Sequence, residues 1–240
     1  MPEQVEPLNT HQHRDLAMHA SAGQHPHCVQ IVTGEVGHAA TCCPIFFVKD
    51  PETGRFNLIA LFGFQPGDLL VQGMDQGSGQ TSGQAGNSGR PLFIPLEMIR
   101  QGFFIDGDTI VIDPAHPRFA PGGTIPLFDA MGEPTDEMRL IQRSLGALVA
   151  GREATEAFTA EMMRLRLIEP IDISLRFDDG EKLTLEGLYT ISLDALHDLP
   201  DADVLTLFRS GHLATAITIQ ASQRQVSALA QRKNNKITQA

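Results

Sequence analysis

The clearest hydrophobic pattern lies in the first third of the chain, where two nearly continuous apolar runs cover residues 45–49 and 56–62. They are joined by the sequence Asp50-Pro51-Glu52-Thr53-Gly54. Proline presets φ in a turn and glycine can adopt positive φ, so this connection predicts a β-hairpin. Because the runs lack polar alternation, both strands are expected to be covered on both faces.

Shorter apolar segments predict further elements in the first half of the chain. A second hairpin is expected where residues 103–105 and 109–112 flank Asp106-Gly107-Asp108. The remaining expected elements are a strand at 28–32, a short helix at 35–43 and one or two helical turns at 95–101.

A helical pattern begins after Pro134. Thr135 is a suitable N-cap, and the acidic residues that follow complement the positive end of a helix. Apolar residues then recur at three- and four-residue spacing through residue 165, interrupted at Gly151. The pattern predicts either two helices or one helix kinked near Gly151.

Strict alternation of apolar and polar residues marks a third hairpin over residues 171–191. A two-residue Asp179-Gly180 turn would place the two apolar sets on opposite faces. A loop of three or five residues aligns them and puts Phe177 opposite Leu183, so a five-residue or bulged turn is expected here. Short acidic helices (193–210), an apolar segment (213–219) and an amphipathic helix (222–233) are expected to follow.

Strands and helices thus come in blocks, which favours an α+β fold with antiparallel β-hairpins packed against a helical segment and short C-terminal helices. The predicted organisation is a flexible N-terminal tail (1–27), a single domain (28–233) and a C-terminal tail (234–240). Within the domain, residues 73–90 are rich in Gly, Ser and Gln and predict a flexible loop.

Composition limits the possible partners. The formal charge of −11 and the pI of about 5.2 disfavour nucleic acid and anionic membrane surfaces. The N-terminal residues lack the pattern of a secretory signal, and no apolar run reaches the length of about 18 residues that a membrane span needs. A cytoplasmic location with reduced cysteines is therefore expected.

Two motifs could bind metal. Cys42 and Cys43 are adjacent and lack the spacing of a zinc site, so we expect small apolar packing residues and no disulfide. Six of the nine histidines lie within the first 38 residues, and the N-terminal ones are expected to belong to a solvated tail, with metal binding as the alternative. No cofactor is expected.

The most chemically dense short segment is Asp113-Pro114-Ala115-His116-Pro117-Arg118, which leaves a predicted strand. It places an acid, an imidazole and a guanidinium on a stiff loop, and loops on rigid scaffolds often carry binding residues. Asp113, His116 and Arg118, with Arg100 nearby, are therefore the candidate binding residues. A turn with local salt bridges is the simpler interpretation.

Four segments in this order resemble the SapC-like family of bacterial proteins: PIFFVKDPETGRFNLIALFGFQPGD (44–68), PLFIPLEMIRQGFF (91–104), PLFDAMGEPTDEM with the helix after it (126–168), and EPIDISLRFDDGEKLTLEGLYTIS through RSGHL (169–213). The resemblance covers roughly residues 28–233. Members typically carry Tyr where this chain has Cys43, which favours a packing role for that residue. We expect Cys43 to be buried with Ile45 or Phe46.

The resemblance implies a role connected with the bacterial surface layer or with TonB-dependent uptake, because members are often encoded near outer-membrane receptors of that type and near halogenase-like proteins. It supplies no catalytic residues. The leading hypothesis is a non-enzymatic binding or accessory protein with a protein or peptide partner. The alternative is a tailoring enzyme with a site around Asp113, His116 and Arg118. The oligomeric state is not predicted.

Overall fold

A computed structural model describes residues 4–20, 26–68, 70–71 and 93–239 of the chain. The predicted loop at 73–90 lies outside the described residues. The strands are β1 (Glu6–Pro7), β2 (Ala17–Met18), β3 (Cys28–Gln30), β4 (Ile45–Lys49), β5 (Phe56–Leu61), β6 (Phe103–Asp106), β7 (Thr109–Ile112), β8 (Ile125–Pro126), β9 (Ile168–Arg176) and β10 (Lys182–Ile191). The α-helices are α1 (Val36–Ala39), α2 (Leu96–Ile99), α3 (Asp136–Arg164), α4 (Leu193–His197), α5 (Asp201–Ser210), α6 (His212–Ser222) and α7 (Gln225–Gln239), and the 3-10 helices are η1 (Thr33–Glu35) and η2 (Pro117–Phe119).

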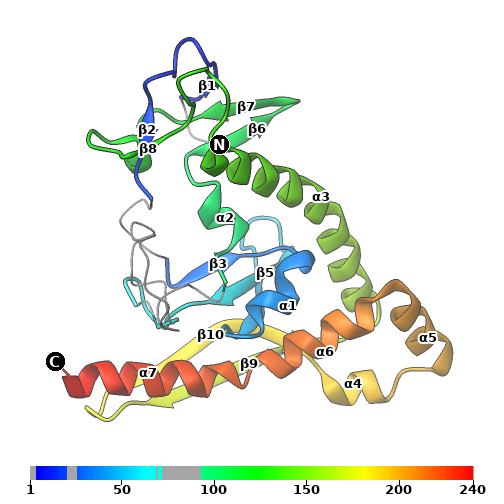
Figure 1. The fold of residues 1–240 in the computed structure, drawn as a ribbon. Coiled ribbons are helices and arrows are strands. Elements are labelled where there is room, and N and C mark those ends of the chain that lie inside the picture. The colour runs from blue at the N-terminus through cyan, green and yellow to red at the C-terminus, as the bar shows by residue number, and fades with distance from the viewer. Residues whose placement is uncertain (1–3, 21–25, 69, 72–92, 240) are drawn as a thin grey trace, which may run out of the picture.

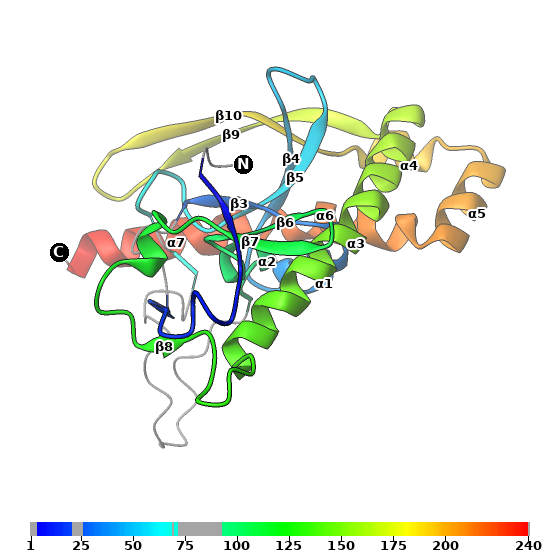
Figure 2. The same ribbon diagram turned by 90° about the horizontal axis from the view of Figure 1, so that it is seen from above.

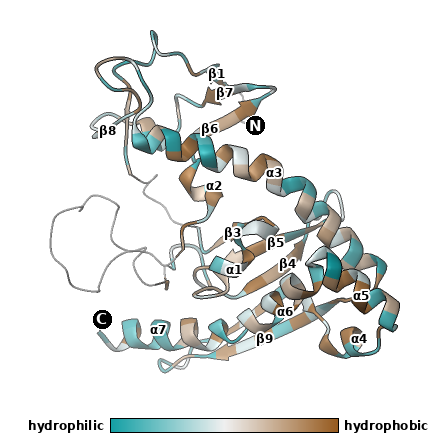
Figure 3. Cartoon of the chain, turned by 45° about the vertical axis from the view of Figure 1, so that its right-hand side comes forward, coloured by the Kyte–Doolittle hydropathy of each residue, from teal (hydrophilic) through white to brown (hydrophobic). Residues whose placement is uncertain are grey.

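The main sheet has five antiparallel strands in the order β3-β5-β4-β10-β9. In Figure 1, α6 and α7 lie along this sheet, and Figure 2 shows the β9–β10 hairpin extending along the molecule. The strands β4 and β5 are brown along most of their length in Figure 3, whereas α7 is mostly teal. The predicted α+β class and the 45–62 hairpin are confirmed.

The described residues form two hydrophobic cores. The large core joins the five-stranded sheet, the C-terminal half of α3 and helices α1 and α5–α7, with Phe46, Phe47 and Phe158 fully buried. The small core lies against the N-terminal half of α3 and consists of Met18, Phe103, Ile112, Phe119, Leu127, Phe128, Met138, Ile141 and Leu145. The long helix α3 therefore connects the two cores. Figure 1 shows the path of this helix, from its start near β6 and β7 to its end near α5 and α6.

Helix α3 is continuous over 29 residues, so the alternative with two separate helices is wrong. Thr135 caps it by accepting a hydrogen bond from the Met138 N–H, as predicted. Gly151 has a packing role instead of a helix-breaking one. A Cβ atom there would lie 2.7 Å from Val32 Cγ2, so glycine allows the segment after β3 to approach the helix closely.

The β9–β10 hairpin has the predicted five-residue connection (177–181), and it aligns the apolar sets by pairing Leu175 with Leu183. The expected pairing of Phe177 with Leu183 is wrong, because the Phe177 N–H instead donates to the Glu181 carbonyl. A bulge also interrupts β10 between Leu185 and Leu188, where Gly187 adopts a φ of 74°. Such a bulge inserts an extra residue and shifts the register beyond it.

The N-terminal residues differ from the expected flexible tail. Strand β1 pairs with β7, and β2 pairs with β8. His13 is buried, and both ring nitrogens have partners: Nε2 lies 2.9 Å from Glu6 Oε1, and Nδ1 accepts from the Asn9 N–H. These contacts were not predicted, because the segment is polar and because strands of two residues, such as β1 and β2, have no detectable hydrophobic pattern.

The C-terminal end also differs from the prediction, since α7 continues through residues 234–239. Lys233 holds this helix by ion pairs with Glu181 (3.2 Å) and Asp68 (3.8 Å). Among the described residues, no helix has both the length and the apolar composition that crossing a bilayer requires.

Candidate functional site

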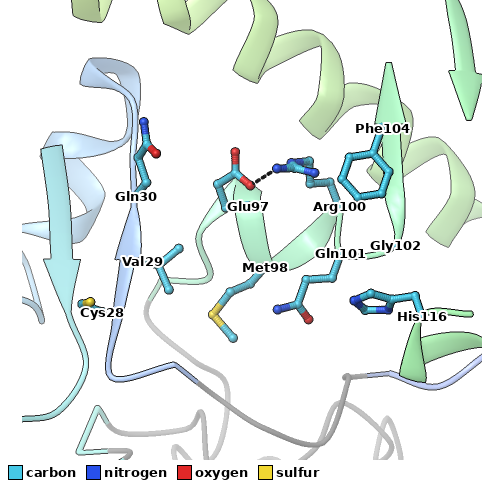
Figure 4. Close-up of a pocket in the computed structure, with 10 residues that line it drawn as sticks. All are labelled: Cys28, Val29, Gln30, Glu97, Met98, Arg100, Gln101, Gly102, Phe104 and His116. Atoms are coloured by element: carbon cyan, nitrogen blue, oxygen red, sulfur yellow. Dashed lines mark ion pairs between the residues drawn. The ribbon is translucent and has the colours of Figure 1, made fainter. Parts of the chain in front are cut away.

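A cleft of about 430 Å³ lies between the edge of the five-stranded sheet and α2 (Figure 4). One wall is β3, and the other comes from α2, the turn after it and the start of β6. The lining residues are Cys28, Val29, Gln30, Glu97, Met98, Arg100, Gln101, Gly102, Phe104 and His116. Met98 packs on the large core and its neighbour Ile99 on the small core, so α2 lies between the two.

Arg100 is held in place at this cleft. Its guanidinium forms an ion pair with Glu97, donates to the Phe103 carbonyl at 3.1 Å, and lies 5.2 Å from the centre of the Phe104 ring. The ion pair neutralises the two charged side chains that line the cleft among the described residues. Arg100 can therefore offer N–H groups to a ligand without adding a net charge.

His116 is oriented by the 3-10 helix η2. Its Nδ1 accepts a hydrogen bond from the Arg118 N–H at 3.2 Å, so the neutral ring carries its proton on Nε2. Burial lowers the pKa of His116, an effect that Asp113 opposes and Arg118 reinforces. At neutral pH the ring is thus an uncharged N–H donor at the cleft.

Gly102 makes room for this ring. Its φ is +84°, and a Cβ atom there would lie 3.2 Å from His116 Nδ1 and 2.9 Å from Phe119 Cε2. Both the backbone conformation and the space favour glycine at this position.

Arg118 has a structural role and does not line the cleft. The side chain is buried and donates from Nε to the His19 carbonyl at 3.2 Å and from Nη1 to the Ile99 carbonyl at 2.5 Å and the Gln101 carbonyl at 3.2 Å. Burial lowers its pKa to about 10. It therefore joins the N-terminal segment to the end of α2.

Asp113 stabilises its own turn by accepting from the Ala115 N–H at 3.0 Å. Of the four residues predicted as a site, the structure brings Arg100 and His116 to the cleft, while Asp113 and Arg118 support the surrounding backbone. The acid, the imidazole and the buried guanidinium do not converge on one cavity.

The sequence did not identify the other lining residues. Cys28, Val29 and Gln30 were predicted as a strand, but their position at a sheet edge depends on pairing with β5, which is distant in sequence. Glu97 could have been found, because it lies three residues before Arg100 on a predicted helical turn.

Glu35 connects the two walls of the cleft. Its carboxylate accepts from the Val32 N–H (3.0 Å), which follows β3, and from the Leu96 N–H (2.9 Å), which begins α2. The side chain is only 6% exposed. Burial raises the pKa of Glu35, while the two backbone N–H groups oppose that rise and Glu97 adds to it.

Cys43 is buried with Ile45 and Phe46 in the large core and forms no disulfide, as predicted. Its Sγ lies 3.5 Å from Cys42 Sγ, and this contact together with burial raises the pKa of the Cys43 thiol. Among the residues that the structure describes, no three His, Cys, Asp or Glu side chains are grouped closely enough to hold a metal ion.

Comparison with known proteins identifies the family. No curated protein and no solved structure is significantly similar to the chain. The family model named SapC matches residues 8–229, which adds most of the N-terminal segment to the range expected from the four sequence segments. The chain therefore belongs to the SapC family.

Proposed function

We propose that this SapC-family chain is a non-enzymatic binding protein that holds a protein or peptide partner in the cleft between β3 and α2. The observation that carries the proposal is the cleft itself, whose volume of about 430 Å³ lies within the range of ligand sites, about 300–1,000 Å³. Its lining combines apolar surface from Val29, Met98 and Phe104 with polar groups at fixed positions.

The polar groups suit recognition of a neutral polar ligand. His116 Nε2 is a donor, Gln101 supplies an amide, and Arg100 keeps its charge paired with Glu97. Mixed apolar and hydrogen-bonding surfaces of this kind are typical of protein interfaces. The contacts of Asp113 and Arg118 give both residues structural roles, so the geometry offers little support to the tailoring-enzyme alternative.

The biological setting is part of the same proposal. The family resemblance supports an accessory role in surface-layer or TonB-dependent uptake systems, and a cytoplasmic location is proposed with it. Cell fractionation tests the location independently of the cleft.

Site-specific photocrosslinking in the native cell tests the binding function. A photoreactive phenylalanine at Gln101 faces the cleft, and the same group at the exposed Asp172 on β9 is the control. We expect one reproducible protein or peptide adduct from position 101 and none of the same mass from position 172. Identical adducts from both positions, or none from position 101, would contradict the proposal.

A further inference from the structure

The free edge of β3 points to the kind of partner. We infer that the cleft binds an extended polypeptide segment, which adds as a strand to β3 through the backbone groups of Cys28 and Gln30. This inference rests on the proposed binding function and specifies how the partner is recognised.

The pairing of β3 with β5 determines which backbone groups are available. The Ile31 N–H donates to the Leu58 carbonyl at 3.0 Å, and the Phe62 N–H donates to the His27 carbonyl at 2.7 Å. In an antiparallel pair these bonds occur at every second residue. The odd-numbered residues of this segment therefore face β5, and the N–H and C=O groups of Cys28 and Gln30 point away from it.

These four groups have no hydrogen-bond partner among the described residues. Unpaired backbone groups along a strand edge are a template for another strand. In the sheet order β3 is the terminal strand, so no other strand of the described sheet covers this edge.

The edge opens into the cleft and not onto bare solvent. All three residues of β3 line the cleft, and Figure 4 shows β5 on one side of β3 and Met98, Gln101 and His116 on the other. A three-residue strand spans about 10 Å, which allows up to four backbone hydrogen bonds from Cys28 and Gln30. Strand addition of this type uses backbone bonds for affinity and side-chain contacts for selectivity.

The lining predicts the chemistry of the added segment. Glu97 and Arg100 neutralise each other, so the wall offers no unpaired charge to attract a charged side chain. Val29 and Met98 provide apolar surface where Figure 4 shows them facing each other. The partner segment is therefore uncharged, with an apolar residue opposite Val29 and acceptor groups within reach of His116 Nε2.

The test uses short random peptides displayed on phage and selected against the full-length protein. Selected peptides are synthesised with single backbone N-methyl groups at each position in turn, which remove one N–H without changing the side chain. Strand addition predicts affinity losses of about tenfold at every second position and small effects between them. A loss pattern without this alternation overturns the inference.

Two edge variants provide a second readout. Gln30→Pro removes an N–H that points away from β5, and Ser174→Pro removes an N–H that points away from β10. The Phe177 N–H bonds to the Glu181 carbonyl, and bonds to β10 recur at every second residue, so the backbone groups of Ser174 face the free edge of β9. Proline is tolerated at such edge positions. We expect Gln30→Pro to weaken peptide binding by about tenfold and Ser174→Pro to leave it unchanged, with thermal unfolding confirming that both variants fold.

Gln101→Trp separates the inference from the proposed function, because the indole fills the cleft from the α2 wall. Binding that is lost in Gln101→Trp but shows no N-methyl alternation overturns strand addition and leaves the cleft as the binding site. If no peptide is selected, or if Gln101→Trp binds normally, both proposals fail.

Discussion

The two edges of the five-stranded sheet avoid unwanted pairing in different ways. Strand β9 forms one edge over nine residues and presents Glu169, Pro170, Asp172 and Arg176 as exposed side chains. Charges and proline on an edge strand oppose association with other strands. Strand β3 forms the other edge with only three residues, Cys28, Val29 and Gln30, none of them charged.

The difference shows where the chain is prepared for a partner. At β9 the side chains themselves oppose pairing, whereas at β3 protection comes from α2 and the small core across the cleft. An edge that is sheltered but not charged can accept a strand that fits between the walls. Binding of a strand at β3 therefore depends on the contacts that hold these walls together.

The largest expected effect is on stability, from removal of the carboxylate that joins the walls. Glu35→Ala leaves the Val32 and Leu96 N–H groups without their acceptor. Buried unsatisfied groups cost about 1–3 kcal/mol each, so the free energy of unfolding should fall by about 3 kcal/mol in chemical denaturation. Glu35→Gln keeps one acceptor oxygen and should lose about half as much; equal stability of Glu35→Ala and wild type would contradict the role of Glu35.

A matched pair of glycine substitutions on α3 tests the other support of β3. Gly151→Ala places a methyl group against Val32, whereas Gly146→Ala meets no atom within 4 Å. In Gly151→Ala the cost of overpacking should exceed the gain in helix propensity, so the free energy of unfolding should fall by about 1 kcal/mol. In Gly146→Ala the free energy of unfolding should rise by about 0.5–1 kcal/mol. Thermal unfolding measures both, and a stabilising Gly151→Ala would show that the approach of Val32 is not restrictive.

The pH dependence of stability provides a smaller test of the same carboxylate. The pKa of Glu35 is raised by burial, so between its unfolded and folded values the folded state binds more protons than the unfolded state. This contribution to stability is complete below the unfolded pKa and is lost as the pH rises through the folded pKa. Relative to Glu35→Gln, wild type should lose stability as the pH rises above about 4.5. Parallel pH profiles of the two proteins would contradict the shift.

The smallest effect is expected at His116, which is only partly buried. Its pKa is lowered by burial, so the folded state binds fewer protons than the unfolded state below the ordinary value of 6.5. Stability from this group is present above pH 6.5 and is lost as the pH falls through the folded value. His116→Asn keeps an acceptor for the Arg118 N–H but does not titrate, and its unfolding should depend less on pH in this range. A variant with the same pH dependence as wild type would exclude this contribution.

Local signals in the sequence predicted most of the fold. The Asp50–Gly54 turn, the Thr135 cap and the alternation around Asp179-Gly180 depend on residues close in sequence, and all three elements are present. The bulge at Gly187 and the contacts of His13 were missed, because the first depends on pairing with β9 and the second on a two-residue strand. Arg100 and His116 were found by their chemistry. The β3 wall of the cleft was not identified from the sequence, because the order of strands in the sheet depends on contacts between residues distant in the chain.

Residue-resolved amide hydrogen exchange with and without a selected peptide tests the central claim most directly. In the free protein the Val29 amide faces β5 and should exchange slowly. The amides of Cys28, Gln30, Ser174 and Arg176 face the two free edges and should exchange faster. Strand addition predicts that the peptide slows exchange at Cys28 and Gln30 and leaves Ser174 and Arg176 unchanged. A bound peptide that leaves exchange at Cys28 and Gln30 unaltered would contradict the account.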